Sequence, residues 1–124
     1  MKKDIKSQAV ASAPTLSQAI EANGFVFVSG QIHADAEWKL QGETVKEKMD
    51  VIFQNISSVL EAGGLSLDNI LKVTIYVTDM AQMPEINQYY PTYFTTPLPA
   101  REAICVAALP LGATIEISVI GAKS

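Results

Sequence analysis

The stretch TVKEKMDVIFQNISSVLEAGG, residues 44–64, decides the fold class because it holds the clearest helix in the chain. Thr44 and Glu47 have the spacing of a capping box, in which each side chain satisfies a free backbone N–H of the other residue. Gly63 and Gly64 end the run, since glycine commonly ends helices. The apolar residues in between recur at the spacing of one helical face: Val45, Met49, Ile52, Ile56, Val59 and Leu60. One side of this helix is therefore predicted to pack on a core.

Strand-like segments lie on both sides of this helix. Residues 24–32 follow a turn pair and are rich in β-branched and aromatic side chains, and residues 17–21 are expected to pair with them as a hairpin. Residues 69–78 form a second β-prone run after the helix, with a right-handed crossover if the two strands are parallel. Residues 1–14 are polar and small and predict an extended lead-in outside the core. Residues 33–42 predict a surface loop.

The rest of the chain predicts a second helix and two closing strands. The helix is expected near residues 83–94 and should kink or end early, because Pro91 cannot donate to the carbonyl of Asn87. Its apolar face holds Met83, Ile86, Tyr90, Tyr93 and Phe94. Residues 101–108 and 114–120 are expected to form an antiparallel pair of strands around a turn at 109–112.

The element order is therefore strand, strand, helix, strand, helix, strand, strand within one domain, residues 1–124. This order indicates an α+β two-layer sandwich whose mixed β-sheet is covered by two helices on one face. The other face must be buried by something else, and identical subunits are the simplest candidate. A hydrophobic fraction of 48% is sufficient for a real core.

Composition narrows the functional class. The net charge is −4 and the nine basic residues are spread along the chain, so nucleic acid is an unlikely main partner. No stretch approaches the roughly 18 apolar residues of a membrane span, and no apolar signal segment follows the basic start. The single cysteine, Cys105, excludes an internal disulfide and suits a reducing compartment. We therefore expect a cytoplasmic protein.

Several segments together carry a family resemblance. They are Ser17-Gln18-Ala19-Ile20, Val28-Ser29-Gly30-Gln31-Ile32, the helix end Ala62 to Leu65, Asn87, Pro99-Ala100-Arg101, Leu109-Pro110 and Ile115-Glu116-Ile117. In this order and spacing, over nearly the whole chain, the sequence resembles the RidA/YjgF (reactive intermediate deaminase) family, also called L-PSP endoribonuclease-like. The resemblance implies a chorismate-mutase-like fold and a homotrimer with a central barrel and three clefts between subunits. It also implies hydrolysis of reactive enamines and imines, such as 2-aminoacrylate, to a 2-keto acid and ammonia, without a cofactor.

The resemblance directs attention to a few side chains, and their chemistry fits. Arg101 offers a planar fork of donors that can hold both oxygens of a substrate carboxylate. Hydrolysis also needs a group that orients water and takes its proton, and Glu116 is the candidate. The resemblance further implies substrate contacts from Ser29 and Gly30 and from the backbone at Ala103. Asn87 is expected to orient a ligand or the loop beside it.

Each of these residues has a plainer interpretation. Outside its motif, Arg101 would be a surface salt-bridge residue and Glu116 a solvated glutamate. Asn87 and Ser29 are about as well explained by ordinary hydrogen bonding. Cys105 is more simply a small hydrophobe than a nucleophile, because no histidine lies near it in the sequence.

The family pattern and this chain differ in places. Leu16 stands where a tyrosine is usual, Ala103 where a cysteine is usual, and Cys105 where a glutamate is usual in that strand, which leaves the preferred substrate open. The acidic residues around His33 are read as solvated, so no metal is expected. Two other functions stay open: a non-catalytic trimer that binds small metabolites in the same clefts, and a ribonuclease, against which the acidic balance argues.

Overall fold

The helix predicted at residues 44–64 is α1 (Val45–Ala62) in the computed structural model, which describes residues 1–124. Its capping box is complete: the Glu47 N–H donates to the Thr44 hydroxyl over 3.1 Å, and the Thr44 N–H donates to the Glu47 carboxylate over 3.1 Å. The expected apolar face is buried against the sheet from Met49 to Leu60, while Val45 is half-buried at its start. Local sequence thus defines this element at both ends.

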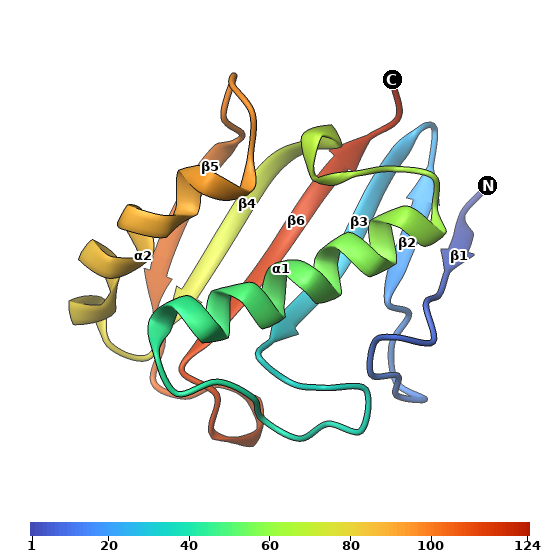
Figure 1. Cartoon of the computed structure of the whole chain (residues 1–124). Coiled ribbons are helices and arrows are strands. Elements are labelled where there is room, and N and C mark those ends of the chain that lie inside the picture. Colours follow the sequence, from blue (N-terminus) through green and yellow to red (C-terminus); the bar gives the residue numbers. More distant parts are fainter.

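The sheet has six strands in the order β1-β2-β3-β6-β4-β5. The strands are β1 (Lys3–Ile5), β2 (Ala19–Ala22), β3 (Phe25–Ile32), β4 (Ile70–Val77), β5 (Ala100–Cys105) and β6 (Ile115–Ala122). All neighbours are antiparallel except β4 and β5, which are parallel. Both helices lie on one face of this sheet, as Figure 1 shows, so the predicted α+β two-layer arrangement with a mixed sheet is confirmed.

The pairing of the last two strands differs from the prediction. β5 and β6 do not form an antiparallel pair; β6 inserts between β3 and β4, and β5 lies at the sheet edge beside β4. In the centre, β6 buries Ile115, Ile117 and Val119 under the helices, whereas β5 is largely exposed. Placing β6 in the centre of the sheet buries its apolar face. This burial therefore outweighs the closeness of the two strands in the sequence, which favoured a hairpin.

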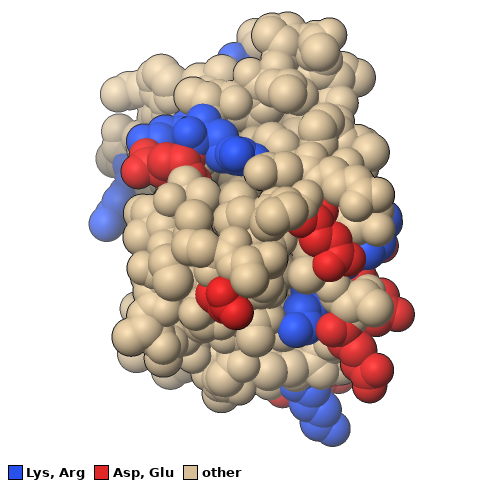
Figure 2. All heavy atoms as spheres, turned by 90° about the vertical axis from the view of Figure 1, so that its left-hand side faces the viewer, with Lys and Arg blue, Asp and Glu red and all other residues tan.

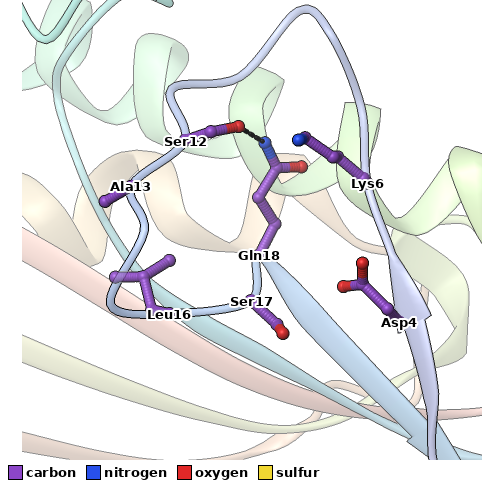
Figure 3. A pocket seen from close by; sticks show the side chains of 7 residues that line it. All are labelled: Asp4, Lys6, Ser12, Ala13, Leu16, Ser17 and Gln18. Atoms are coloured by element: carbon purple, nitrogen blue, oxygen red, sulfur yellow. Dashed lines mark hydrogen bonds between the residues drawn. The ribbon is translucent and has the colours of Figure 1, made fainter.

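The N-terminal segment is not the loose lead-in that its composition predicted. β1 pairs with β2, and Ile5, Val10 and Ala11 are buried. Buried Gln18 holds the segment, because its amide nitrogen donates to the carbonyls of residues 7, 10 and 11 and its amide oxygen accepts from the Ser7 N–H. Figure 3 shows this side chain pointing into the segment, beside a small pocket of about 70 Å³.

The second helix ends early, as Pro91 predicted. α2 (Met83–Tyr89) is followed at once by a 3-10 turn, Tyr90–Tyr93. Further short 3-10 turns are Leu67–Asn69, Met80–Gln82 and Pro110–Gly112. Aromatic rings from this region pack on Phe53 of α1, with Tyr93 stacked at 4.2 Å between ring centroids.

The face of the sheet away from the helices carries apolar side chains with no cover. Val26 and Val28 of β3 are buried under α1, but the alternating residues Phe25 and Phe27 are 46% and 49% exposed. Ile104 of β5 is exposed on the same face. No helix of the structure is long and apolar enough to cross a membrane.

Candidate functional site

Arg101 lies near the start of β5, at the free edge of the sheet. It is paired with Val73 of β4, so its side chain leaves the sheet on the helix-covered face. It is also the only arginine of the chain. Its side chain is exposed and forms no salt bridge, whereas the neighbouring Glu102, on the opposite face, pairs with Lys72 at 2.7 Å. The full charge of Arg101 is thus free to meet an external anion.

Two residues of the α2 region hold the guanidinium group. Arg101 Nη1 donates to the amide oxygen of Asn87 over 2.7 Å, and Arg101 Cζ lies 5.0 Å from the ring centroid of Tyr90. Asn87 and Tyr90 are three residues apart, so they lie on one helical face. The sequence predicted that Asn87 orients a ligand or the loop beside it; in the structure, its amide oxygen accepts a hydrogen bond from Arg101. The remaining guanidinium donors keep the fork that a carboxylate requires.

Ser29 and Gly30 lie at an irregularity of β3. The register between β3 and β6 shifts between Val28 and Gln31, which is a β-bulge. The Ser29 hydroxyl donates to the Ser17 carbonyl over 2.6 Å, and the Ser29 N–H donates to the Gln18 carbonyl over 2.9 Å. The hydroxyl proton of Ser29 therefore ties β3 to the residues just before β2, and the hydroxyl oxygen keeps the capacity to accept a hydrogen bond.

Glu116 lies against the bulge. It is half-buried on β6, and a Cβ atom at position 30 would overlap its carboxylate oxygen Oε2. Glycine at position 30 therefore makes the room that the carboxylate occupies. Burial raises the pKa of Glu116 above its usual range, because the charged form loses hydration. No side chain forms an ion pair with it.

Within one chain, the arginine and the glutamate lie on opposite faces of the sheet. Arg101 shares a face with Val73 and Val119, whereas Glu116 is paired with Tyr76 and lies on the open face with Ser118. Arg101 is joined to Asn87, and Glu116 is joined to Gly30, but the structure does not bring the two pairs together. A single chain thus presents two half-sites.

Ala103 and Cys105 lie on β5, as Arg101 does, whereas Leu16 lies before β2. Ala103 is half-buried, opposite Ile75 and on the face of Arg101, and Cys105 is an exposed free thiol at the end of β5. Leu16, which replaces the usual tyrosine of the family, is 46% exposed next to Ser17. Small side chains along β5 leave the surface beside the arginine shallow.

The surroundings of the β5 edge carry little charge. Figure 2 views the molecule from the side of α2 and β5 and shows a mostly uncharged surface, with small separate groups of both signs. No group of three or more His, Cys, Asp or Glu side chains is placed to hold a metal ion. A continuous basic surface of the kind that binds nucleic acid is absent from this view.

Sequence reasoning missed the contact of Tyr90 with Arg101. It assigned Tyr90 to the core, and the residue is indeed only 4% exposed. The spacing of three between Asn87 and Tyr90 was the available signal, since residues three apart on a helix are neighbours. The bulge at Ser29 and Gly30 left no signal beyond the glycine itself.

The chain is similar to known proteins over nearly its whole length. The family described as "Endoribonuclease L-PSP" matches residues 6–123. A "RutC family protein" of Aquifex aeolicus is 44% identical over 109 residues, covering 86% of this chain and 87% of that protein. A protein of Mus musculus named "2-iminobutanoate/2-iminopropanoate deaminase" is 34% identical over 118 residues, covering 94% of this chain and 87% of that protein.

Solved structures show the same fold. The crystal structure of yeast Mmf1 superimposes with a TM-score of 0.95 at 36% identity and covers 100% of both chains. The crystal structure of Escherichia coli TdcF with bound serine has a TM-score of 0.89 at 28% identity and covers 98% of this chain and 99% of that one. The fold predicted from the resemblance is therefore the fold of solved relatives.

Proposed function

The chain belongs to the RidA/YjgF family, and we propose that it hydrolyses reactive 2-enamino and 2-imino acids, such as 2-aminoacrylate, to 2-keto acids and ammonia. The observation that carries this proposal concerns Arg101, the only arginine of the chain. Asn87 and Tyr90 hold its guanidinium group, and its other N–H donors remain free to bind a carboxylate. The name of the mouse relative states the same chemistry for that protein.

Arg101 anchors the substrate carboxylate in this proposal. A guanidinium group stays charged at any working pH and can donate two parallel hydrogen bonds to one carboxylate. The backbone at Ala103 and the small residues around it then contact the nitrogen end of a short substrate. The crystal structure of TdcF with bound serine supports this substrate class, because serine carries a carboxylate and a nitrogen on adjacent carbons.

Glu116 handles the water in this proposal. The enamine first tautomerises to the imine, and water then adds across the C=N bond while the Glu116 carboxylate takes a proton from the water. That proton then passes from Glu116 to the nitrogen, which gives the neutral carbinolamine. Glu116 next takes the hydroxyl proton of the carbinolamine and passes it to the nitrogen, so the C–N bond breaks, ammonia leaves and the C=O bond of the keto acid forms. One water enters and one ammonia leaves, so the reaction involves no net oxidation and needs no redox cofactor. The raised pKa makes Glu116 a stronger base than a solvated glutamate.

The complete site is proposed to form between copies of the chain. Arg101 and Glu116 lie on opposite sheet faces, so no motion within an intact sheet brings them together. The open face with Phe25 and Phe27 supplies apolar area for an interface. We propose a homotrimer whose clefts join the arginine of one protomer to Glu116, Ser29 and Gly30 of its neighbour. We place the reaction in the cytoplasm, which suits the free thiol of Cys105.

The test is turnover of an imine generated in place. A pyridoxal-phosphate-dependent dehydratase releases 2-aminoacrylate, and keto acid and ammonia are followed with and without the protein. We expect acceleration by the wild type and a KM roughly tenfold to a hundredfold higher for Arg101→Lys, which keeps the charge but loses the fork. Lys123→Ala, which removes the ion pair with Glu21 beyond the end of β6, is the control and keeps wild-type kinetics. No acceleration by the wild type on any amino-acid-derived imine would contradict the proposal.

A non-catalytic binding function is the second candidate, because TdcF was crystallised with serine bound. Titration calorimetry with pyruvate or 2-ketobutyrate measures binding separately from turnover. Binding that Arg101→Ala abolishes, without any acceleration of hydrolysis, would favour this candidate. An arginine-directed dicarbonyl reagent adds a chemical check, because Arg101 is its only arginine target and a bound keto acid should protect it.

A further inference from the structure

Tyr90 forms a floor under the guanidinium group of Arg101. It follows α2 directly, and its ring centroid lies 5.0 Å from Arg101 Cζ. This distance is within the range in which an aromatic face attracts a cation. Together with the hydrogen bond from Nη1 to Asn87, the ring restrains the end of a long and otherwise flexible side chain.

The ring of Tyr90 is itself fixed. It is 4% exposed and packs at 6.4 Å from the ring of Phe53 and at 5.1 Å from that of Phe94, centroid to centroid. Its hydroxyl group is buried and has no hydrogen-bond partner. The aromatic face, and not the hydroxyl, is therefore the part of Tyr90 that Arg101 meets.

We propose that Tyr90 is a positioning residue, which holds the Arg101 guanidinium in the orientation that receives a carboxylate. An arginine on an exposed edge strand has many rotamers, and each binding event would have to freeze them. The ring and the Asn87 amide oxygen restrict those rotamers before the ligand arrives. This inference rests on the proposed function for its catalytic consequence, and on the geometry alone for the restraint of the side chain.

A plain core role for Tyr90 predicts something different. A core residue affects stability, and its loss would lower the melting temperature without a specific effect on Arg101. The experiment therefore compares two identical substitutions in one segment, Tyr90→Leu and Tyr93→Leu. Tyr93 stacks on Phe53 at 4.2 Å, and its hydroxyl donates to Asp50. The cation–π contact of Arg101 is with Tyr90, so Tyr93→Leu removes packing and the hydrogen bond to Asp50 and leaves that contact in place.

The readout that does not depend on activity is the NMR signal of the arginine side chain. Because Arg101 is the only arginine, its Nε–Hε group gives one assignable resonance of its kind. In the wild type, the ring current of Tyr90 should displace the Arg101 side-chain protons from their random-coil shifts. Tyr90→Leu should remove this displacement, Tyr90→Phe should restore it, and Tyr93→Leu should leave it unchanged.

The kinetic readout is the split between KM and kcat. Loss of a cation–π contact of ordinary strength corresponds to an increase of about fivefold in the KM for the imine. We expect this increase for Tyr90→Leu with kcat changed less, rescue by Tyr90→Phe, and wild-type KM for Tyr93→Leu. Melting temperatures of all variants show that they fold.

The outcomes separate this inference from the proposed function. Arg101 resonances that are the same in Tyr90→Leu and the wild type, or that move equally in Tyr93→Leu, would overturn the positioning role. If the resonances move as expected but the wild type hydrolyses no imine, the restraint of Arg101 stands and the proposed deaminase activity fails.

Discussion

Glu116 owes its chemical character to Gly30. The bulge in β3 brings the backbone of Gly30 against the carboxylate, and the absence of a Cβ atom leaves space for it. The same close approach removes water from the carboxylate, which is why burial raises its pKa. A raised pKa in a partly buried carboxylate is typical of general acid and base residues.

The pH dependence of hydrolysis should report this carboxylate. When the pH falls through the raised pKa of Glu116, the carboxylate takes up a proton and can no longer accept one from water. We therefore expect kcat/KM to fall on the acid side, with an apparent pKa above the usual glutamate value of 4.5. Glu116→Gln should lose roughly 10²- to 10⁴-fold in kcat, the usual contribution of a general base, and should lose this acid limb. Steady-state rates across pH 4 to 8 measure both.

Gly30→Ala is the companion variant. The added methyl group would meet the flexible end of the Glu116 side chain, so the chain should fold while the carboxylate moves away. We expect a lower kcat with little change in melting temperature, whereas Gly64→Ala, at a turn with open space around it, should affect stability alone because of its positive φ of 81°. For the pH profile, an acid limb that persists in Glu116→Gln would show that a group other than Glu116 causes the loss of activity at low pH.

The residues of the site were predictable from the sequence to different degrees. The family pattern singles out Arg101 and Glu116 as candidates, and the alternation of side chains along a strand is sufficient to put Arg101 and Ala103 on one face. The face of Glu116 relative to Arg101 depends on which strands pair, which alternation within one strand does not reveal. The contact with Tyr90 likewise needs the distance between α2 and β5.

His33 fastens the loop after β3, a role hidden from its loop-like sequence. The residue is 2% exposed; Nδ1 lies 3.0 Å from the Gln41 carbonyl, and Nε2 accepts from the Thr114 N–H over 3.1 Å. Accepting at Nε2 requires the neutral ring with its proton on Nδ1. A loop read as solvated thus contains a buried link to the start of β6.

Stability should therefore fall in mild acid. Burial lowers the pKa of His33 below its usual 6.5, so the unfolded chain takes up a proton at a higher pH than the folded chain does. The stabilisation is complete above about pH 6.5 and is lost as the pH falls toward the folded pKa. His33 is the only histidine, so denaturant unfolding between pH 7.5 and 5.5 should lose more stability in the wild type than in His33→Gln. Glu37→Gln, exposed in the same loop, should keep the wild-type slope; equal slopes in all three would contradict the prediction.

Local sequence patterns predicted which helices and strands form better than they predicted which strands lie side by side. α1 and the early end of α2 follow from caps, glycines and a proline, which act over a few residues. The place of β6 between β3 and β4 depends on packing between distant segments, and its pattern of alternate burial fits several positions in a sheet. β1 was missed because three residues give too short a pattern. Gln18 holds the segment after β1 through hydrogen bonds that polarity alone does not predict.

The two half-sites of each chain allow a test of the proposed assembly. Arg101→Ala and Glu116→Gln should each be nearly inactive alone. In trimers formed by unfolding and refolding an equal mixture, a cleft has wild-type Arg101 with probability one half and wild-type Glu116 from the neighbour with probability one half. Activity should therefore return to about one quarter of the wild-type value. Sedimentation should show particles of three chains.

A second mixture of variants tests independently whether Arg101 and Glu116 of one cleft come from different chains. The double variant mixed equally with the wild type should give about one quarter of full activity if the two groups come from different chains, and about one half if they come from the same chain. No recovery in the first mixture together with one half in the second would show that one chain supplies both groups.

Because Arg101 and Glu116 lie on opposite faces of the sheet, a newly synthesised chain should be inactive before it assembles. If the protein is active only as the proposed trimer, a monomer carries two incomplete reaction centres and no complete one. It is therefore inactive until it associates with other copies of the chain. Activity per chain should consequently fall on dilution, as trimers dissociate. The exposed Phe25 and Phe27 of β3 would be buried by the same association that completes the reaction centre.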